Sequence, residues 1–595
     1  MRAPLRRSTT VALVGAAAVA ALLGAASSGQ AQGMFPAVPD PFAPKAVERV
    51  DAPLAKLSAV TPAMLESPPA SDWLMWRRTY DGYGFSPLEQ INKANVANLK
   101  VAWTWSMANG PQQGTPLVHD GVLFVQSNGD GVEALNASNG DLLWRYTARL
   151  PREVAPSQKR MMALAGDKLL LATSNKHIVA LNMKTGAVEW DQAVAGEGTF
   201  TSGPMVVDDR VIIGATGCNM GRCSITGHEL ATGKEVWRFY TVAGPGEPGG
   251  ETWNGIPLDE RYGGSSWTSG SYDPSTKLLY WGVGQPYPWN PFARGTSPLK
   301  PGNSDEALYT DNTLALDPQT GKLVWHYSHL PNDSWDMDYV FERTLVDVPV
   351  DGKMRRLTVT SGKLGIIEGV DAKTGQFVFA KDMGIQNIVQ SIDPVTGKKT
   401  INPAVIPELN KTVTICPHPG GGRSVGATAY DPRTKILYLP LQEHCTDMTP
   451  GPKEPGEKTA PSKFVLKLFP GSDGNLGRLD AVNLATRKNV WTHRERAPQS
   501  TGSLPTAGGV VFQGQLDRYF KAYDSATGKE LWKTRLNDVP NSAPISFSVA
   551  GKQYIAVTTG SGGPMTRTWL SMLPEIRNPP ASGATVWVFE LPDRR

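Results

Sequence analysis

One eleven-residue phrase recurs along most of this chain, and it restricts the possible folds more than any other feature. Each copy is a strand that ends in Asp, Asn or Glu, a tight turn usually built on Thr-Gly, and a second strand that ends in an aromatic residue. Asn, Asp and Gly suit such turns because they tolerate positive φ or cap the turn. The copies lie at 134–144, 180–190, 227–237, 315–325, 369–379, 481–491 and 522–532.

A second strand pair precedes most copies, as in 168–175 (KLLLATSN) and 210–217 (RVIIGATG). Four short strands per repeat correspond to one blade of a β-propeller. Successive copies start 46, 47, 88, 54, 112 and 41 residues apart, so the two long intervals contain inserted loops or degenerate blades. We therefore predict an all-β, eight-bladed β-propeller in which the chain ends combine to close the ring and the recurrent Trp packs each blade on the next.

The first residues have the pattern of an export signal. Arg2, Arg6 and Arg7 precede an apolar, Ala-rich run at 11–26, and Ala31 offers a cleavage site. A membrane anchor is the alternative, but the run is short and Ala-rich, and no later stretch is apolar enough to span a bilayer. We expect a periplasmic protein. The predicted division is a signal peptide (1–31), an N-terminal extension (32–71) and the propeller (72–595).

Charge and cysteine content exclude several classes of protein. The formal net charge of +4 is small for 595 residues and no basic stripe is present, which argues against nucleic-acid binding. An even number of cysteines in an exported chain suggests disulfides, and we hypothesise the pairs Cys218–Cys223 and Cys416–Cys445. Free, buried cysteines are the alternative. The absence of CxxCH and HExxH motifs argues against attached c-type haem and zinc.

The repeat resembles the tryptophan-docking repeat of the alcohol dehydrogenases that depend on pyrroloquinoline quinone (PQQ). Blocks outside the repeat resemble that family too, so the resemblance covers nearly the whole mature chain. These blocks are DWLMWRRTYDGYGFSPLEQINKANVANLKVAWTW (72–105), GKEVWRFYTVAGPGEP (233–248), YDPSTKLLYWGVGQPYPWN (272–290), HLPNDSWDMDYV (329–340) and TAGGVVFQGQLDRYFKAYDSATGKELW (506–532). The resemblance implies oxidation of an alcohol with PQQ and a metal ion, and transfer of electrons to a separate cytochrome c.

The resemblance also implies two catalytic residues. Asp336, which follows Trp335, would remove the hydroxyl proton of the alcohol, and this requires a carboxylate within hydrogen-bond reach. Lys363, in SGKLG, would lie over the reacting quinone oxygen and stabilise the charge that develops there. The alternatives are a turn aspartate and a solvated turn lysine.

Further positions match the family's cofactor contacts. Trp267 would form the floor beneath PQQ by stacking, and Arg160 would pair with a PQQ carboxylate. Gln113 stands where the family has Glu, and Gln442 where it has Asn. The remaining implied contacts are the hydroxyls of Thr201 and Ser265 and the loop residues Thr216, Gly217 and Cys218.

The metal site departs from the family's usual Glu, Asn and Asp. The matching positions are Asn219, Gln285 and Asp336, with Asp338 as an additional carboxylate like that of lanthanide-using members. Two carboxylates and two amides are hard oxygen ligands that suit Ca²⁺. We therefore favour Ca²⁺, with a lanthanide as the alternative ion and a plain turn residue as the alternative for Asp338.

The pocket walls depart as well. Val154 and Ala155 replace the family's vicinal cysteines, and Ser500, Pro564 and Val425 replace large aromatics of methanol-oxidising relatives. A wider cavity would hold methanol poorly, so we expect a bulky secondary alcohol, a polyol or a cyclic alcohol. The alternatives are a PQQ enzyme for sugars or aldehydes, and a non-catalytic propeller scaffold of the outer-membrane assembly type.

Overall fold

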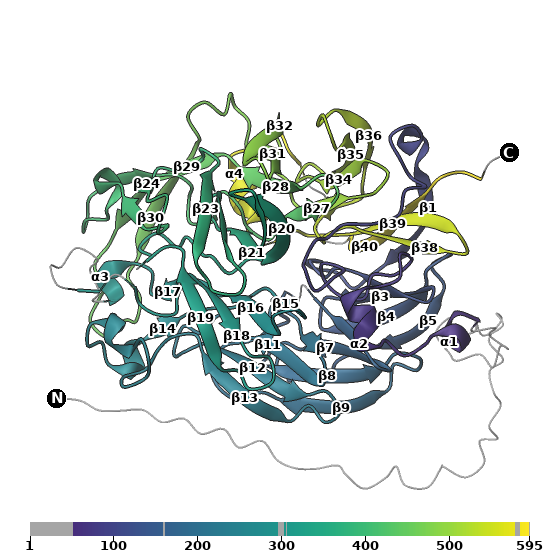
Figure 1. Ribbon diagram of the computed structural model, residues 1–595, viewed down its shortest axis with the longest axis horizontal. Helices are drawn as coiled ribbons and strands as arrows, with labels where there is room; N and C mark the ends of the chain where they lie inside the picture. The colour runs from purple at the N-terminus through teal and green to yellow at the C-terminus, as the bar shows by residue number, and fades with distance from the viewer. Residues whose placement is uncertain are drawn as a thin grey trace, which may run out of the picture. The chain divides into compact units, whose positions relative to one another are not determined.

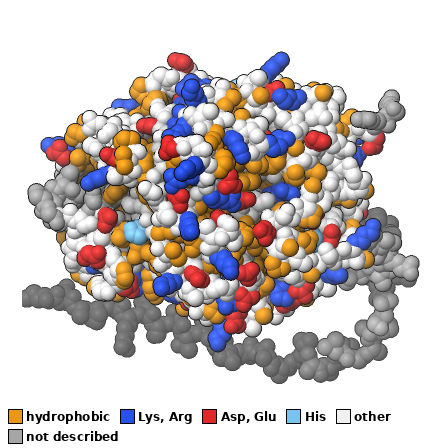
Figure 2. All heavy atoms as spheres, in the orientation of Figure 1, with side chains coloured by type: hydrophobic (Ala, Val, Ile, Leu, Met, Phe, Trp, Pro, Cys, Tyr) orange, Lys and Arg blue, Asp and Glu red, His pale blue; other side chains and the backbone are white. Residues whose placement is uncertain are grey.

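Short antiparallel strands dominate the computed structural model of the chain (Figure 1). The predicted signal peptide, Arg160 and Pro564 lie outside the described residues. On the face drawn in Figure 2, basic and acidic side chains are interspersed without a stripe of one sign. The described residues are 52–158, 161–294, 303–304, 306–331, 333–563, 565–577 and 583–593.

Five four-stranded sheets are built from strands that pair in chain order, each with its neighbour in the sequence. Each ends with a copy of the repeated phrase, which supplies its third and fourth strands. The first three are β2 (Leu117–His119), β3 (Val122–Ser127), β4 (Gly131–Asn136) and β5 (Leu142–Tyr146); β6 (Ala163–Ala165), β7 (Lys168–Ala172), β8 (His177–Asn182) and β9 (Val188–Ala193); and β10 (Met205–Val207), β11 (Arg210–Gly214), β12 (Ser224–Glu229) and β13 (Glu235–Tyr240). The other two are β20 (Thr344–Val350), β21 (Lys353–Ser361), β22 (Ile366–Asp371) and β23 (Phe377–Asp382); and β33 (Leu504–Pro505), β34 (Val510–Gly514), β35 (Tyr519–Asp524) and β36 (Glu530–Arg535).

Two further four-stranded sheets contain insertions, which explain the two long repeat intervals. The first is β15 (Ser271–Asp273), β16 (Leu278–Gly282), β18 (Asn312–Leu316) and β19 (Leu323–Ser328); the second is β27 (Ala429–Asp431), β28 (Ile436–Gln442), β31 (Gly477–Asn483) and β32 (Lys488–Glu495). The inserted strands form three small sheets: β14 (Tyr262–Gly263) with β17 (Pro286–Tyr287); β24 (Val389–Ile392) with β25 (Lys399–Ile401); and β26 (Val413–Ile415), β29 (His444–Pro450) and β30 (Ser462–Leu468). Both long intervals are therefore insertions rather than degenerate blades.

The first and last strands of the described chain share one five-stranded sheet. The strand β1 (Lys100–Ser106) pairs with β40 (Thr585–Glu590), and Trp105 lies opposite Val586. The same sheet contains β37 (Val539–Pro540), β38 (Ile545–Val549) and β39 (Lys552–Gly560). A ring that is closed by the first and last strands requires this pairing.

Helices are few and short in the described residues. They are α1 (Ala52–Lys56), α2 (Pro62–Glu66), α3 (Pro291–Arg294) and α4 (Thr566–Ser571), with single 3-10 turns at Val96–Asn98, Gly250–Trp253, Leu258–Glu260 and Pro403–Val405. None of the described helices has the length and apolar character needed to cross a bilayer.

The repeated tryptophans contact the next sheet along the chain. The Trp144 indole at the end of one sheet donates a 2.9 Å hydrogen bond to the Met183 carbonyl of the next, and its ring lies over Gly186. A Cβ at Gly186, where φ is +70°, would lie 2.6 Å from that ring, so only glycine fits. Five other indoles donate to carbonyls in the same way: Trp103 to Ala137, Trp190 to Leu230, Trp237 to Pro318, Trp325 to Ala372 and Trp491 to Ser525.

At one interface between successive sheets, both the tryptophan and the glycine of this contact are replaced. Phe379 replaces the tryptophan, and Arg487 replaces the glycine at a φ of 60°. The Arg487 guanidinium lies 5.1 Å from the centroid of the Phe379 ring. A cation–π contact between Arg487 and Phe379 therefore replaces the packing of an indole ring on a glycine turn.

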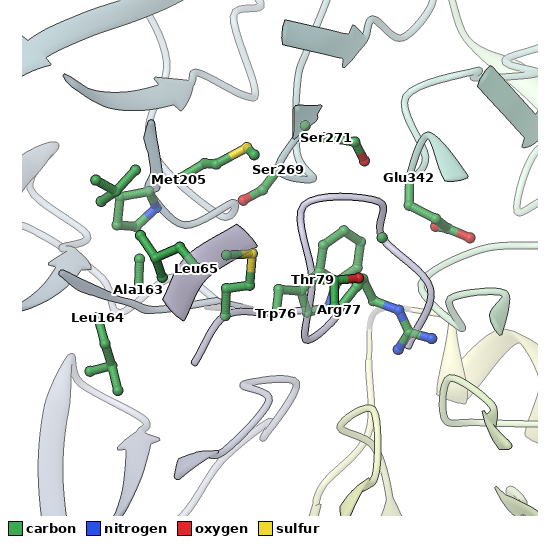
Figure 3. A pocket seen from close by; sticks show the side chains of 15 residues that line it. Leu65, Trp76, Arg77, Thr79, Ala163, Leu164, Met205, Ser269, Ser271 and Glu342 are labelled. Carbon is green, nitrogen blue, oxygen red and sulfur yellow. The ribbon is translucent and has the colours of Figure 1, made fainter. Parts of the chain in front are cut away.

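The segment before β1 is fixed inside the molecule by a buried arginine. Arg77 donates to the carbonyls of Thr428 (2.6 Å) and Ser503 (3.2 Å), which belong to distant parts of the sequence. Figure 3 shows the pocket that this segment lines, with Arg77 and Glu342 at one end and Leu65 at the other. This pocket shares no lining residue with the candidate active site described below.

Candidate active site

Asp336 lies in the loop after β19, and a neighbouring aspartate shapes that loop. Asp333 accepts hydrogen bonds from the backbone N–H groups of Trp335 (2.7 Å) and Met337. The Trp335 indole donates a 3.0 Å hydrogen bond to the Val405 carbonyl. Asp336 itself has a φ of 64°, a left-handed conformation that Asp adopts more readily than most residues. The predicted base is therefore held in a sparsely populated backbone conformation, which is common at functional sites.

Lys363, just after β21, lies against both carboxylates of the predicted metal site. Its Nζ is 2.6 Å from Asp338 Oδ2 and 3.2 Å from Asp336 Oδ1, and it donates a 2.8 Å hydrogen bond to the Asp336 carbonyl. Burial alone would lower the pKa of Lys363, but the two carboxylates outweigh burial and raise it. Burial also raises the pKa of Asp336. The predicted base and the predicted cation are thus in direct contact in a buried setting.

A pocket of about 600 Å³, here called the metal-side pocket, brings together all four predicted metal ligands. Asp336 Oδ1 is buried with the Lys363 ammonium 3.2 Å away, and Asp338 Oδ1 accepts a hydrogen bond from the Gln285 backbone N–H (3.2 Å). Amide and carboxylate oxygens with spare lone pairs fit a hard cation such as Ca²⁺. The lining residues are Thr216, Gly217, Asn219, Gly263, Ser265, Trp267, Gln285, Tyr287, Asp336, Asp338 and Lys363.

A disulfide supports the loop that carries Asn219. Cys218 and Cys223 are bonded to each other, and Cys416 is bonded to Cys445, so both hypothesised pairs are confirmed. Cys218 is fully buried and is not among the residues that line the metal-side pocket. The Gly217 N–H donates a 3.1 Å hydrogen bond to Ser265 Oγ, which joins this loop to the strand segment that precedes Trp267.

The Trp267 ring has a fixed orientation. It packs edge-to-face on Phe341, with centroids 5.0 Å apart and planes at 85°. The guanidinium of buried Arg423 lies over the Phe341 ring, 4.4 Å from its centroid. A flat ring held in this way suits the floor beneath a planar cofactor.

A second space, the central chamber, adjoins the metal-side pocket and shares Trp267, Asp336, Asp338 and Lys363 with it. It measures about 650 Å³. Its other lining residues are His418, Pro419, Gly420, Ser424, Val425 and Met565. An alcohol in this chamber would have access to both Asp336 and Lys363.

The central chamber shares Ser424, Val425 and Met565 with a third space of about 460 Å³, the amide pocket. Four carboxamides line it: Gln113, Gln442, Gln499 and Asn541. Each has at least one buried polar atom without a hydrogen-bond partner among the described residues. Such atoms cost about 1–3 kcal/mol each when left unpaired. The amide pocket therefore fits a ligand that offers many hydrogen-bonding groups. The carboxylates at one edge of PQQ are groups of this kind.

Most of the predicted site residues therefore meet in three connected spaces. Thr201 and Cys218 line none of the three, and Arg160 lies outside the described residues. Sequence reasoning missed His418, Gln499, Asn541 and Trp569, because single polar or aromatic residues in separate loops give no local signal. Trp569, from α4, lines the amide pocket beside Ser500. One large aromatic wall is thus present although Val425 and Ser500 are small.

Comparison with known proteins decides the family. The family model described as "PQQ: Glucose/ethanol/alcohol dehydrogenase, beta-propeller domain" matches residues 73–383 and 469–555. The chain belongs to the PQQ-dependent alcohol dehydrogenases. It is therefore an oxidoreductase with a β-propeller fold that uses PQQ, and Ca²⁺ or a lanthanide is typical of the family.

Individual relatives agree with this assignment. This quinoprotein is 32% identical over 558 residues to a quinoprotein ethanol dehydrogenase of Pseudomonas putida, with 85% of this chain and 88% of the relative covered. It is 32% identical over 547 residues to the dehydrogenase subunit of a quinone-dependent alcohol dehydrogenase of Gluconobacter oxydans, with 83% and 71% covered.

Solved structures give the same result. A quinohemoprotein alcohol dehydrogenase of Pseudomonas putida HK5 superposes with a TM-score of 0.80 at 28% identity, covering 91% of this chain and 84% of that one. A europium-containing methanol dehydrogenase also superposes with a TM-score of 0.80 at 28% identity, covering 89% and 99%.

Proposed function

We propose that this quinoprotein oxidises a bulky or secondary alcohol to the corresponding carbonyl compound. The observation that carries the proposal is the central chamber, which places Asp336, Lys363 and Trp267 around one space of about 650 Å³. Val425 in its wall and Ser500 in the adjoining amide pocket leave room for more than a methanol-sized substrate.

Asp336 is the proposed general base. Its half-buried carboxylate, which lines the central chamber, takes the proton of the substrate hydroxyl. PQQ, when bound, accepts the hydride and thus the two electrons that leave the carbinol carbon. Lys363 holds a positive charge beside the reaction, because its buried ammonium is kept protonated by Asp336 and Asp338.

The proposed cofactor contacts follow the three spaces. Trp267 would stack on the flat face of PQQ, and Ser265, Thr216 and Gly217, which line the same pocket, would contact the cofactor, with Cys218 remaining a predicted contact. The carboxamides of the amide pocket, Gln113 and Gln442 among them, would donate to its carboxylates. Arg160 and Thr201 remain predicted contacts. Asn219, Gln285, Asp336 and Asp338 would hold Ca²⁺ in preference to a trivalent lanthanide, because two carboxylates balance a divalent charge.

We further propose that the seven four-stranded sheets and the five-stranded sheet are the eight blades of one ring. The indole contacts between successive sheets and the β1–β40 pairing support this. The N-terminal export pattern supports a periplasmic location. A separate periplasmic cytochrome c is the proposed electron acceptor, because the sequence has no CxxCH motif for a haem of its own.

The test is the change Asp336→Asn in the protein loaded with PQQ and Ca²⁺. Loss of the base predicts a fall in kcat of about 10²–10⁴-fold in a dye-linked assay with a secondary alcohol. The exposed residue Asp259 gives a matched control, and Asp259→Asn should leave kcat unchanged. Full activity in Asp336→Asn would contradict the role of Asp336, and oxidation of sugars or aldehydes alone would contradict the proposed substrate.

A further inference from the structure

His418 is held rigidly in the wall of the central chamber. The Cys416–Cys445 disulfide joins its loop to β29. The His418 backbone N–H donates a 3.1 Å hydrogen bond to Nδ1 of buried His444, and His444 Nε2–H donates a 3.0 Å hydrogen bond to the Gly421 carbonyl. The loop over the chamber is therefore fixed at both ends.

The His418 ring presents a hydrogen-bond donor. The Gly420 backbone N–H donates a 2.9 Å hydrogen bond to His418 Nδ1, so the proton of the neutral ring is on Nε2. Burial, together with the charge of Lys363, lowers the pKa of His418 to about 4, which keeps the ring neutral. No described residue hydrogen-bonds to Nε2, and the ring lines the same chamber as Asp336 and Lys363.

The chemistry of oxidation restricts what this donor can bind. The reacting oxygen gives its proton to Asp336, and its negative charge decreases as hydride leaves the adjoining carbon. Once the proton has left, a donor on that oxygen would stabilise the alkoxide more than the transition state for hydride transfer, which slows that step. The Nε2–H group is therefore suited to an oxygen that does not react.

We propose that His418 Nε2–H binds a second hydroxyl of the substrate, so that the enzyme's substrates are diols or polyols. This inference rests on the proposed function and narrows it from bulky alcohols to alcohols with a neighbouring hydroxyl. A site built to bind a hydroxyl discriminates against the analogue that lacks it, because the donor is then left unpaired.

The experiment compares cyclohexanol with its vicinal diol in the protein loaded with PQQ and Ca²⁺. For wild type we expect kcat/KM to favour the diol. His418→Phe keeps an aromatic ring against Trp569 and Phe464, whose ring centroids lie 6.0 and 5.3 Å from that of His418, but removes the donor. It should lower the ratio of kcat/KM for the diol to kcat/KM for cyclohexanol at least about tenfold, mainly through a higher KM for the diol. His418→Gln, which retains an N–H group, should recover part of the preference.

Calorimetric titration of the diol into the same loaded proteins provides a readout that does not require turnover. Weaker diol binding in His418→Phe than in wild type supports the inference. Equal preference and equal binding in both proteins would overturn it while leaving the proposed oxidation of bulky alcohols intact. Loss of alcohol oxidation with retained, His418-dependent diol binding would instead contradict only the proposed reaction.

Discussion

His119, in the first four-stranded sheet, contacts residues near the start of the described chain. Its Nδ1 lies 2.7 Å from Asp72 Oδ2, and its Nε2 lies 3.0 Å from the Ser58 carbonyl. Burial alone would lower the pKa of His119, but the hydrogen bond and charge of Asp72 outweigh burial and raise it. Folding therefore favours the protonated ring.

This shift predicts a pH dependence of stability. A raised pKa in the folded state contributes stability that is fully present below the unfolded-state pKa of about 6.5 and is lost as pH rises through the folded-state pKa. The difference in free energy of unfolding between wild type and His119→Gln should therefore be largest near pH 5.5 and decrease towards pH 9. Urea unfolding at the two pH values measures it. A difference that increases with pH would show that the ring is neutral in the folded protein.

At the scale of elements, successive sheets are held together by a repeated contact, in which an indole of one sheet packs on the glycine turn of the next. Gly186→Ala adds a methyl group 2.6 Å from Trp144 Cε3, so overpacking should cost about 1–3 kcal/mol beyond the strain of positive φ. The midpoint of urea unfolding measures this cost.

Gly352 provides the matched control for that strain. Its φ of +77° resembles that of Gly186, but a Cβ there meets no atom within 4 Å. Gly352→Ala should therefore report the backbone strain alone. Equal destabilisation by the two changes would mean that the indole contact does not constrain the turn.

The sequence predicted elements well where the signal is local. The turn residues and the final aromatic of each phrase predicted the third and fourth strands, because both are determined within eleven residues. The inserted strands β24–β26, β29 and β30 carry no repeat, so their pairing could not be predicted. Arg487 and Phe379 replace the glycine and the tryptophan of the repeat. The reason for the two replacements could not be predicted, because it depends on the contact between their two sheets.

At the scale of the whole molecule, the site depends on segments far apart in the sequence. The motif around Trp335 and Asp336 predicted the base, and the structure places Asn219, Gln285 and Asp338 beside it. His418, Gln499 and Asn541 were not predicted, because only the arrangement of the sheets brings their loops to the same spaces. The contact of Lys363 with Asp338 was likewise not predicted, although both residues were assigned to the site.

The central claim is that this chain binds PQQ and a metal ion in the three connected spaces and then oxidises alcohols. The most direct measurement is reconstitution of the purified protein with PQQ alone, with PQQ and Ca²⁺, and with PQQ and La³⁺, followed by bound-quinone absorbance and dye-linked alcohol oxidation. We predict stoichiometric PQQ binding and activity that requires both PQQ and metal, with Ca²⁺ more effective than La³⁺. Absence of PQQ binding with every metal would contradict the account, since the residues around Trp267, Asn219 and Gln285 would then not form a cofactor site.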